Sequence, residues 1–339
     1  MPADIDLSCS FPPGPRVIEY ARLAEELGYR RIWLYDSPLL YPDVWMTLAR
    51  IAEATGRIGL GPGVLVPSLR HVATQAAAIA TLEALAPGRV AATIGTGFTG
   101  RRLLGKPPLA WRTVAEYLSS LRALLRGEEV AVDGALLRLL HPEGFAPSRP
   151  LATPLLIAAN GPRGLAVARA HGDGVLALGE PPPGFAWCAL ARSGTLLDPG
   201  ESFATPRVFD ALAPGIALIY HATYEAGGAA VDQLLGGRTW RDAIERVPAK
   251  RRHLVLHEGH CVAVPERERA LLDPGIGAMT FTGTQDELRA RWSALAAAGA
   301  TEIAYAPAGP DIPRELRAMA LVAGLIAGER RSSGLRGDP

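Results

Sequence analysis

The chain has 339 residues, of which 48% are hydrophobic, so it can bury a large core as one domain or two. Its 35 basic and 34 acidic residues give a formal net charge of +1, and neither sign forms a long run. This balance predicts no surface for nucleic acid or membranes. No window reaches about 18 uninterrupted apolar residues, so we expect no membrane span.

The three cysteines lie far apart and form no CxxC pair. That spacing argues against a zinc site or a disulfide framework and is typical of a reducing cytoplasm. The start of the chain, Met1–Phe11, lacks the basic and apolar pattern of a signal peptide. We therefore expect a cytoplasmic protein without a metal.

Strand-like and helix-like patterns alternate through the first half of the chain. The expected pairs are Ile5–Phe11 with Pro15–Leu27, Arg31–Tyr35 with Asp43–Thr55, Ile58–Leu65 with Val72–Ala86, Val90–Gly95 with Trp111–Leu125, and Leu155–Ala159 with Arg163–His171. A further strand is expected at Val175–Leu178. Such alternation indicates a parallel sheet with right-handed crossovers, which a closed barrel and an open doubly wound sheet both satisfy.

The alternation stops between residues 180 and 250. This stretch opens with Pro181–Gly184 and then shows helical patterns at Ile216–Glu225 and Thr239–Val247. The elements expected after it are strands at His253–Leu256, near Ala278–Phe281 and at Glu302–Tyr305, and helices at Asp286–Ala298 and Pro313–Ala327. We expect one domain over residues 1–329 with a helical insertion at about 180–250, the alternative being a separate small domain. The polar residues 330–339 are expected to form a flexible tail.

A glycine-rich motif, Gly95–Gly100, follows an expected strand and fits the pattern GxGxxG. In a Rossmann unit this loop opens directly into a helix, and an acidic residue follows about 20 positions later at the end of the next strand. Here Gly105, Pro107 and Pro108 come next, so we expect no helix to start at the loop, and Glu116 falls inside an expected helix. The motif therefore predicts a turn whose small residues let the backbone approach a flat cofactor.

Two other turns carry backbone-exposing sequence. Gly59–Pro67 has glycines and a proline in an expected buried strand, which predicts a bulge or a close ligand approach. Ala158–Gly164 ends a strand and begins a helix, so its N–H groups and Arg163 suit an anion. An ordinary turn between a strand and a helix has the same appearance.

Titratable residues follow two of the expected strands. Asp36 lies at a strand's carboxyl end, where barrel enzymes carry their chemistry, although it can equally cap a turn. His257–His260 reads HEGH, which is not the HExxH of zinc proteases, and Gly259 argues against their helical geometry. We interpret this loop as catalytic or substrate-contacting rather than metal-binding.

These motifs, in this order and spacing, resemble the luciferase-like flavin and deazaflavin oxidoreductase family. The branch they resemble most is the methylenetetrahydromethanopterin reductase-like one. The segments that carry the resemblance cover nearly the whole chain: Ala24–Tyr29, Asp36–Ser37, Gly61–Val64, Ala84–Val90, Gly95–Gly97, Ala158–Pro162 and Thr282–Leu288.

The resemblance implies a (β/α)8 TIM-like barrel with a long insertion after the sixth or seventh strand. It implies a cofactor ring across the carboxyl mouth and a cis peptide between Gly63 and Val64. The cofactor would be coenzyme F420, a deazaflavin, and FMN is the alternative. The residues expected to bind it are Asp36, Ser37, Gly63, Val64, Thr96, Gly97, Phe98, Ala159, Asn160, Gly161, Pro162 and Arg163.

One departure from the family pattern affects the substrate. Relatives that act on sugar phosphates carry His and Glu where this chain has Ser37 and Phe98. The resemblance then favours a less charged small molecule, reduced by hydride transfer at a C=N or C=C bond. The alternatives are an FMN-dependent monooxygenase and a catalytically degenerate flavin-binding barrel. Family habit also suggests a homodimer.

Hydride transfer to such a bond requires a proton donor within about 2.6–3.2 Å, or one water away. The candidates are His260 and His257 with Glu258, ranked above Asp36, with Tyr220 and His221 available from the insertion. A carboxylate beside a histidine raises the imidazole pKa, so we expect a histidine that is protonated near neutral pH.

Overall fold

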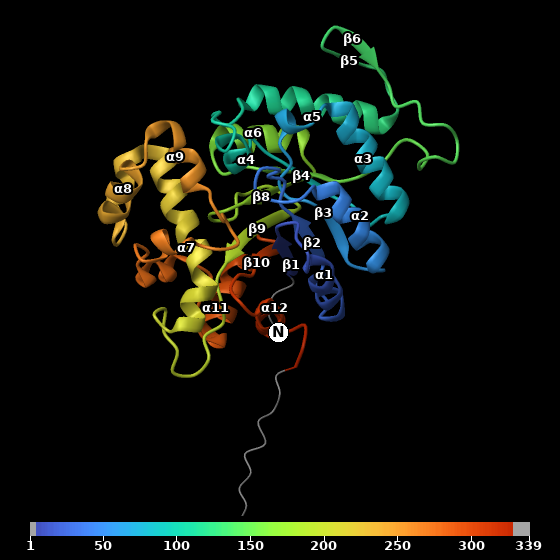
Figure 1. The fold of residues 1–339 in the computed structure, drawn as a ribbon. Coiled ribbons are helices and arrows are strands. Elements are labelled where there is room, and N and C mark those ends of the chain that lie inside the picture. The colour runs from blue at the N-terminus through green and yellow to red at the C-terminus, as the bar shows by residue number, and fades with distance from the viewer. Residues whose placement is uncertain (1–4, 328–339) are drawn as a thin grey trace, which may run out of the picture.

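The computed structural model describes residues 5–327, and at its centre lies a barrel of eight parallel strands (Figure 1). In ring order these are β3 (Gly59–Pro62), β2 (Arg31–Leu34), β1 (Asp6–Phe11), β10 (Glu302–Ala306), β9 (Cys188–Ser193), β8 (Gly174–Ala177), β7 (Leu155–Ala158) and β4 (Ala92–Ile94). Parallel bridges from Leu60 to Val90 and from Leu65 to Ile94 close the ring between β3 and β4. The expected (β/α)8 barrel is confirmed, and the open sheet is excluded.

The closure explains the glycines of β3. A Cβ atom added to Gly61 would lie 1.7 Å from the carbonyl oxygen of Ala91, so only glycine lets the two strands approach. The sequence indicated a bulge or a nearby ligand here. The neighbour that requires Gly61 is the adjacent strand.

Helices pack around the outside of this barrel. They are α1 (Val17–Glu26), α2 (Val44–Ala54), α3 (Val72–Leu85), α4 (Phe98–Arg102), α5 (Trp111–Arg126), α6 (Pro162–His171), α11 (Gln285–Ala297) and α12 (Ile312–Ala323), with a 3-10 turn η1 at Pro67–Leu69. Asp43 caps α2 by accepting from two backbone N–H groups, and Thr284 with Glu287 forms a capping box on α11. One expectation is wrong: the short helix α4 starts at Phe98, directly after Gly97, where we expected none.

The expected insertion at 180–250 has the wrong boundaries, because it hides a barrel strand. Pro181–Gly184 belongs to the loop before β9, and β9 itself pairs in parallel with β8 and β10. Only the first half of β9 is apolar and buried, since Arg192 and Ser193 end it. The helical region therefore follows the seventh barrel strand and runs from Gly194 to Thr284.

Two expected strands lie inside that helical region and are not strands. His253–Leu256 forms the last turn of helix α9 (Ala249–Leu256), and Ala278 and Met279 end a 3-10 helix, η3 (Pro274–Met279). In α9 only Leu256 is buried, so its apolar run covers one side of a short helix and not a strand.

The helical region contributes α7 (Pro206–Gly227), η2 (Gly228–Gln233), α8 (Gly237–Glu245), α9 and α10 (Glu266–Arg269). Figure 1 shows α7, α8 and α9 gathered at one side of the barrel. Their buried side chains, including Ile216, Tyr220, Trp240 and Leu256, form a hydrophobic cluster distinct from that of the barrel. One domain over residues 1–329 stays a prediction, and the expected tail at 330–339 lies outside the described residues.

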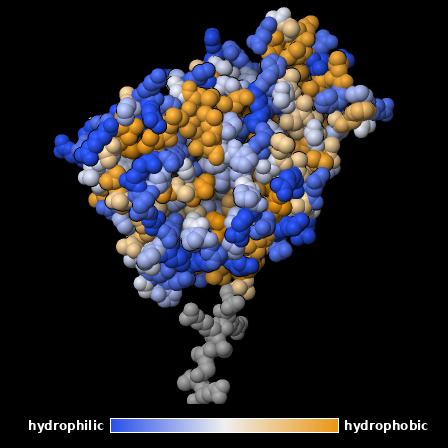
Figure 2. Space-filling model, in the orientation of Figure 1, coloured by the Kyte–Doolittle hydropathy of each residue, from blue (hydrophilic) through white to orange (hydrophobic). Residues whose placement is uncertain are grey.

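A hairpin of β5 (Val130–Val132) and β6 (Ala135–Leu137) projects from the barrel between α5 and β7 (Figure 1). Apolar side chains show at its surface in Figure 2, and Leu136 is 72% exposed. Among residues 5–327, no helix has the length and apolarity to cross a membrane.

Candidate active site

The carboxyl ends of β2, β3 and β4 surround a cavity of about 150 Å³. Parallel strands bring these ends to one mouth, where barrel enzymes place their sites. The residues that line the cavity are Tyr35, Asp36, Ser37, Tyr41, Gly63, Val64, Val66, Gly97, Phe98, Thr99, Gly100, His260 and Cys261. The sequence predicted seven of them as site residues: Asp36, Ser37, Gly63, Val64, Gly97, Phe98 and His260.

Glycine backbone forms much of this lining. The peptide between Gly63 and Val64 is cis, and Gly97 has φ +83° at the start of α4. A Cβ atom on Gly97 would lie 2.5 Å from the Val66 side chain, so a larger residue would be strained and crowded. Peptide groups therefore reach the cavity without intervening side chains.

Asp36 lines the cavity and is held by an ion pair rather than by a turn of its own. Its side chain is 2% exposed and binds the Arg70 guanidinium, which also binds Asp43 at 2.8 Å. Burial raises the pKa of Asp36 above its usual range, and the pairing with Arg70 opposes that rise. The arrangement favours an ionised, fixed Asp36 over a mobile acid.

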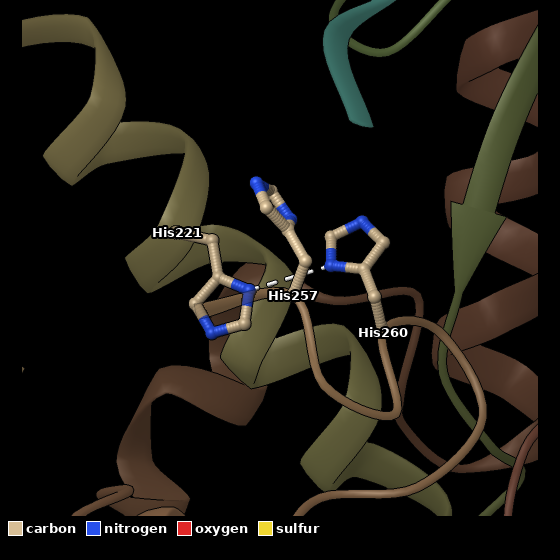
Figure 3. Close-up of side chains that lie close together, drawn as sticks. All are labelled: His221, His257 and His260. Carbon is tan, nitrogen blue, oxygen red and sulfur yellow. Dashed lines mark hydrogen bonds between the residues drawn. The ribbon is translucent and has the colours of Figure 1, made fainter. Parts of the chain in front are cut away.

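A cluster of three buried histidines lies where the helical region meets the barrel mouth (Figure 3). His221 comes from the middle of α7, while His257 and His260 come from the end of α9 and the loop after it. Each offers one ring nitrogen within 4.8 Å of the other two, and the Nδ1 atoms of His221 and His260 are 3.3 Å apart. His260 also lines the cavity.

Buried carboxylates hold two of these rings from behind. His221 Nε2 lies 2.6 Å from Glu268, which is 4% exposed, and His257 Nε2 lies 3.1 Å from Glu225, which is 7% exposed. Arg102 of α4 approaches Glu225 at 3.6 Å. An ionised carboxylate only accepts, so each of these two Nε2 atoms donates to its carboxylate, and in the neutral form of each ring the lone pair is then on Nδ1.

His260 is tied to the barrel side of the interface. Its Nε2 lies 3.1 Å from the Thr99 hydroxyl, and its carbonyl oxygen accepts a hydrogen bond from the Tyr41 hydroxyl. Burial lowers the pKa of His260 well below its usual range, and the two neighbouring imidazoles lower it further. This direction is opposite to the protonated histidine expected from the sequence, because the carboxylates bind the other two rings.

Several predicted site residues lie apart from the cavity. Glu258 is an exposed residue that pairs with Arg267, because it follows the end of α9 and turns outward. The segment from Ala159 to Arg163 follows β7 and starts α6, but it does not line this cavity. Within it Asn160, Gly161, Pro162 and Arg163 are exposed and Ala159 is buried, while the Asn160 side chain accepts from Leu178 N–H.

Of the other two, Thr96 is not in the lining, and its carbonyl oxygen accepts from Leu109 N–H. His257 is not in the lining but packs against Phe98, with the two ring centroids 6.3 Å apart and the ring planes nearly perpendicular.

Sequence reasoning missed the partners that hold these groups. These partners are Arg70, Tyr41, Thr99, Glu225 and Glu268, and only Thr99 belongs to a motif noted in the sequence, Gly95–Gly100. Their only sequence signal was a charged or hydroxyl residue near an expected element end.

The closed barrel and its carboxyl-end cavity define a barrel enzyme. The family model described as luciferase-like monooxygenase matches residues 7–302, so the chain belongs to the luciferase-like monooxygenase family. This confirms the resemblance seen in the sequence, and the chain is accordingly an oxidoreductase.

Relatives with assigned names include reductases and F420-dependent dehydrogenases. A 5,10-methylenetetrahydromethanopterin reductase of Methanolobus tindarius is 32% identical over 179 residues, which cover 51% of this chain and 53% of the relative. This chain thus spans about half the length of that protein. The enzyme of the same name from Archaeoglobus fulgidus is 28% identical over 314 residues, covering 88% and 91%.

Among solved structures, the coenzyme F420-dependent tetrahydromethanopterin reductase of Methanopyrus kandleri superposes with a TM-score of 0.66 at 18% identity. The match covers 96% of this chain and 99% of that one. At this identity the match supports the fold.

Proposed function

We propose that this chain is an F420-dependent oxidoreductase that transfers hydride between the deazaflavin and a small organic metabolite. The observation that carries the proposal is the cavity at the barrel mouth, whose lining combines glycine backbone, Phe98 and the buried Asp36. Relatives named as F420-dependent dehydrogenases support a deazaflavin over FMN.

The lining fits a flat heteroaromatic ring. Gly63, Gly97 and Gly100 bring peptide N–H and C=O groups directly to the cavity, which suits the hydrogen-bonding edge of such a ring. Val64 and Val66 supply apolar contact beside it. When bound, the deazaflavin supplies hydride, and the protein supplies orientation and the proton.

The same arrangement indicates where the rest of the cofactor would lie. The N-terminus of α6 has no side-chain cap, and its first residues, including Arg163, are exposed. Free N–H groups at a helix start favour an anion. We therefore place the cofactor phosphate near Asn160–Arg163.

The reaction proposed is addition of hydride to carbon and of a proton to the other atom of a C=N or C=C bond. Ser37 and Phe98 make the mouth less charged than a sugar-phosphate site requires. Among the predicted catalytic residues, His260 and Asp36 line the cavity, so we assign the substrate-side role to His260. We assign His260 the part of positioning the substrate and a water molecule that delivers the proton.

The test is titration of the purified chain with F420 and, separately, with FMN, followed by ligand fluorescence. We expect tighter binding of F420. Equal or tighter binding of FMN, with oxygen consumed on its reduction, would instead support a monooxygenase. Failure to bind either would leave a degenerate barrel. We also propose that the protein is a cytoplasmic homodimer. Light scattering, which measures the mass in solution, tests the dimer.

A variant series then separates binding from turnover. His260→Asn should keep F420 affinity within a few-fold and lower kcat, whereas Glu258→Gln should alter neither, because Glu258 faces solvent. Normal kcat in His260→Asn with intact binding would remove His260 from the reaction.

A further inference from the structure

The histidine cluster holds an unsatisfied lone pair. His257 is fully buried, and its Nδ1 atom has no hydrogen-bond partner within the described residues. Since Nε2–H donates a hydrogen bond to Glu225, Nδ1 of the neutral ring can only accept, and a buried acceptor without a donor costs free energy. The same reasoning leaves a lone pair on His221 Nδ1, since its Nε2 donates to Glu268.

A hydrogen-bonded relay cannot satisfy all three rings. His260 could donate its Nδ1 proton to His221 Nδ1 at 3.3 Å, but His257 Nδ1 would still lack a donor. A cation between the three rings would give each of them a partner. His260 would then donate its Nε2–H to the Thr99 hydroxyl, 3.1 Å away, and would offer its Nδ1 lone pair to the ion, as His221 and His257 would.

The spacing suits a small metal ion. A tetrahedral zinc site with Zn–N bonds of about 2.0–2.1 Å has ligand nitrogens roughly 3.3 Å apart. The Nδ1 atoms of His221 and His260 already have that separation, 3.3 Å. One ring nitrogen from each of the three histidines lies within 4.8 Å of the other two, so the three rings are close enough together to share one ion.

The surroundings also match a metal centre. Ligand histidines generally donate their outer N–H to a carboxylate or another acceptor, which fixes the ring and increases its basicity. Here Glu268, Glu225 and Thr99 occupy those outer positions. The two buried carboxylates add negative charge, which favours a divalent cation between the rings. Arg102 lies beside one of these carboxylates, Glu225, and balances part of its charge.

We propose that His221, His257 and His260 form a three-histidine site for a divalent metal ion, with Zn²⁺ as the expected occupant. Three protein ligands leave a fourth position for water or a substrate oxygen, as in catalytic zinc sites. Because His260 also lines the cavity, the ion would lie beside the proposed hydride-transfer site. The sequence led us to expect no metal, since His221 lies 39 residues before His260 and outside any ligand motif.

The experiment measures metal binding on the full chain without cofactor, so its outcome is independent of the proposed function. Chelator-treated protein is titrated with Co²⁺, which absorbs visibly when four-coordinate, and Zn²⁺ is then added to displace it. We expect one equivalent of Co²⁺ per chain, displaced by Zn²⁺, and a higher Tm with Zn²⁺.

Three variants assign the site. His257→Ala should abolish the visible bands, and Glu225→Gln should weaken Co²⁺ binding by about 10–100-fold. His253→Ala is the matched control, because His253 lies one turn earlier on α9 and outside the cluster, and it should bind as wild type does. Circular dichroism confirms that each variant is folded.

Wild type without four-coordinate Co²⁺ bands would overturn the proposal. So would equal binding by wild type and folded His257→Ala. If His257→Ala does not fold, the nearly isosteric Glu225→Gln decides, and unchanged affinity in that variant counts against the site.

Discussion

Removing Arg70 tests the ion pair between Arg70 and Asp36 at the cavity. Arg70→Ala leaves the Asp36 carboxylate, 2% exposed, without its cation. Breaking a buried ion pair costs about 3–5 kcal/mol, mostly because one charge stays buried and unpaired. Arg70 is itself 15% exposed, so water can enter the space it leaves, and we expect the lower end, about 3 kcal/mol.

That loss should depend on pH in a defined direction. Burial already raises the pKa of Asp36 above its ordinary value of 3.8, and without Arg70 the folded-state pKa rises further. A carboxyl group with a raised folded-state pKa destabilises the fold only where the unfolded chain would be ionised. The stability gap between wild type and Arg70→Ala should therefore be smallest below pH 3.8 and widen as pH rises toward neutrality.

The assay is urea denaturation at several pH values, together with Tm, which should fall by roughly 4 °C at neutral pH for a chain of 339 residues. Asp36→Asn with Arg70→Ala is the informative control, because it removes the unpaired charge along with its partner. This double variant should be more stable than Arg70→Ala alone. Two results would refute the reasoning. One is a loss of stability that does not change with pH, and the other is a double variant whose loss of unfolding free energy equals the sum of the two single-variant losses.

Three other substitutions test separate parts of the fold and site. Gly97→Ala places a side chain at φ +83° and 2.5 Å from Val66, so it adds both left-handed backbone strain and crowding. Gly28→Ala is the control, because Gly28 also has a positive φ but no atom nearby, and it should lose only the about 1–2 kcal/mol of backbone strain. Urea denaturation should show a larger loss for Gly97→Ala. Glu302→Ala leaves the indole N–H groups of buried Trp33 and half-buried Trp187, bonded at 2.9 and 2.7 Å, without their acceptor, and urea denaturation should show a loss of about 1–3 kcal/mol for Trp33 and less for Trp187. Because Glu302 starts β10, at the opposite end from the cavity, fluorescence titration should show unchanged F420 affinity. Arg163→Ala should weaken F420 binding and flatten its salt dependence between about 0.01 and 0.5 M, and an unchanged salt curve would move the phosphate elsewhere.

The barrel half of the site could be predicted because parallel strands impose simple rules. Asp36, Gly63 and Gly97 follow β2, β3 and β4, and carboxyl ends of neighbouring strands must meet at one mouth. Their side chains and backbone therefore converge whatever the loops do. Such patterns at the strand ends, with the family resemblance, were enough to locate six lining residues, and the seventh, His260, belongs to the helical region.

Where several helices pack on one another, local patterns failed. Pro214 sits inside α7, so the sequence placed the start of that helix ten residues late, at Ile216. The run His253–Leu256 resembled a strand but forms a helix whose Leu256 packs in the helical region. Burial decided both, and burial depends on neighbours that sequence periodicity does not identify.

The failure at Glu258 has the same origin. Adjacent residues at a helix end point in different directions, so His257 turns inward to Glu225 while Glu258 turns outward to Arg267. Its adjacency to His257 in sequence suggested a carboxylate–histidine pair, and such a pair exists. The carboxylate in it comes from α7, 32 residues away.

The two halves of the site are joined by a small set of contacts between distant segments. Tyr41 binds the His260 carbonyl, Thr99 binds the His260 ring, and Arg102 approaches Glu225. The barrel side of this joint supplies the glycine backbone that suits a cofactor, while the helical side supplies the titratable rings. Variation in the helical region can thus change the chemistry beside the cavity while the strand ends keep their shape. That division follows from the fold, because β-strand register fixes one half and helix packing alone fixes the other.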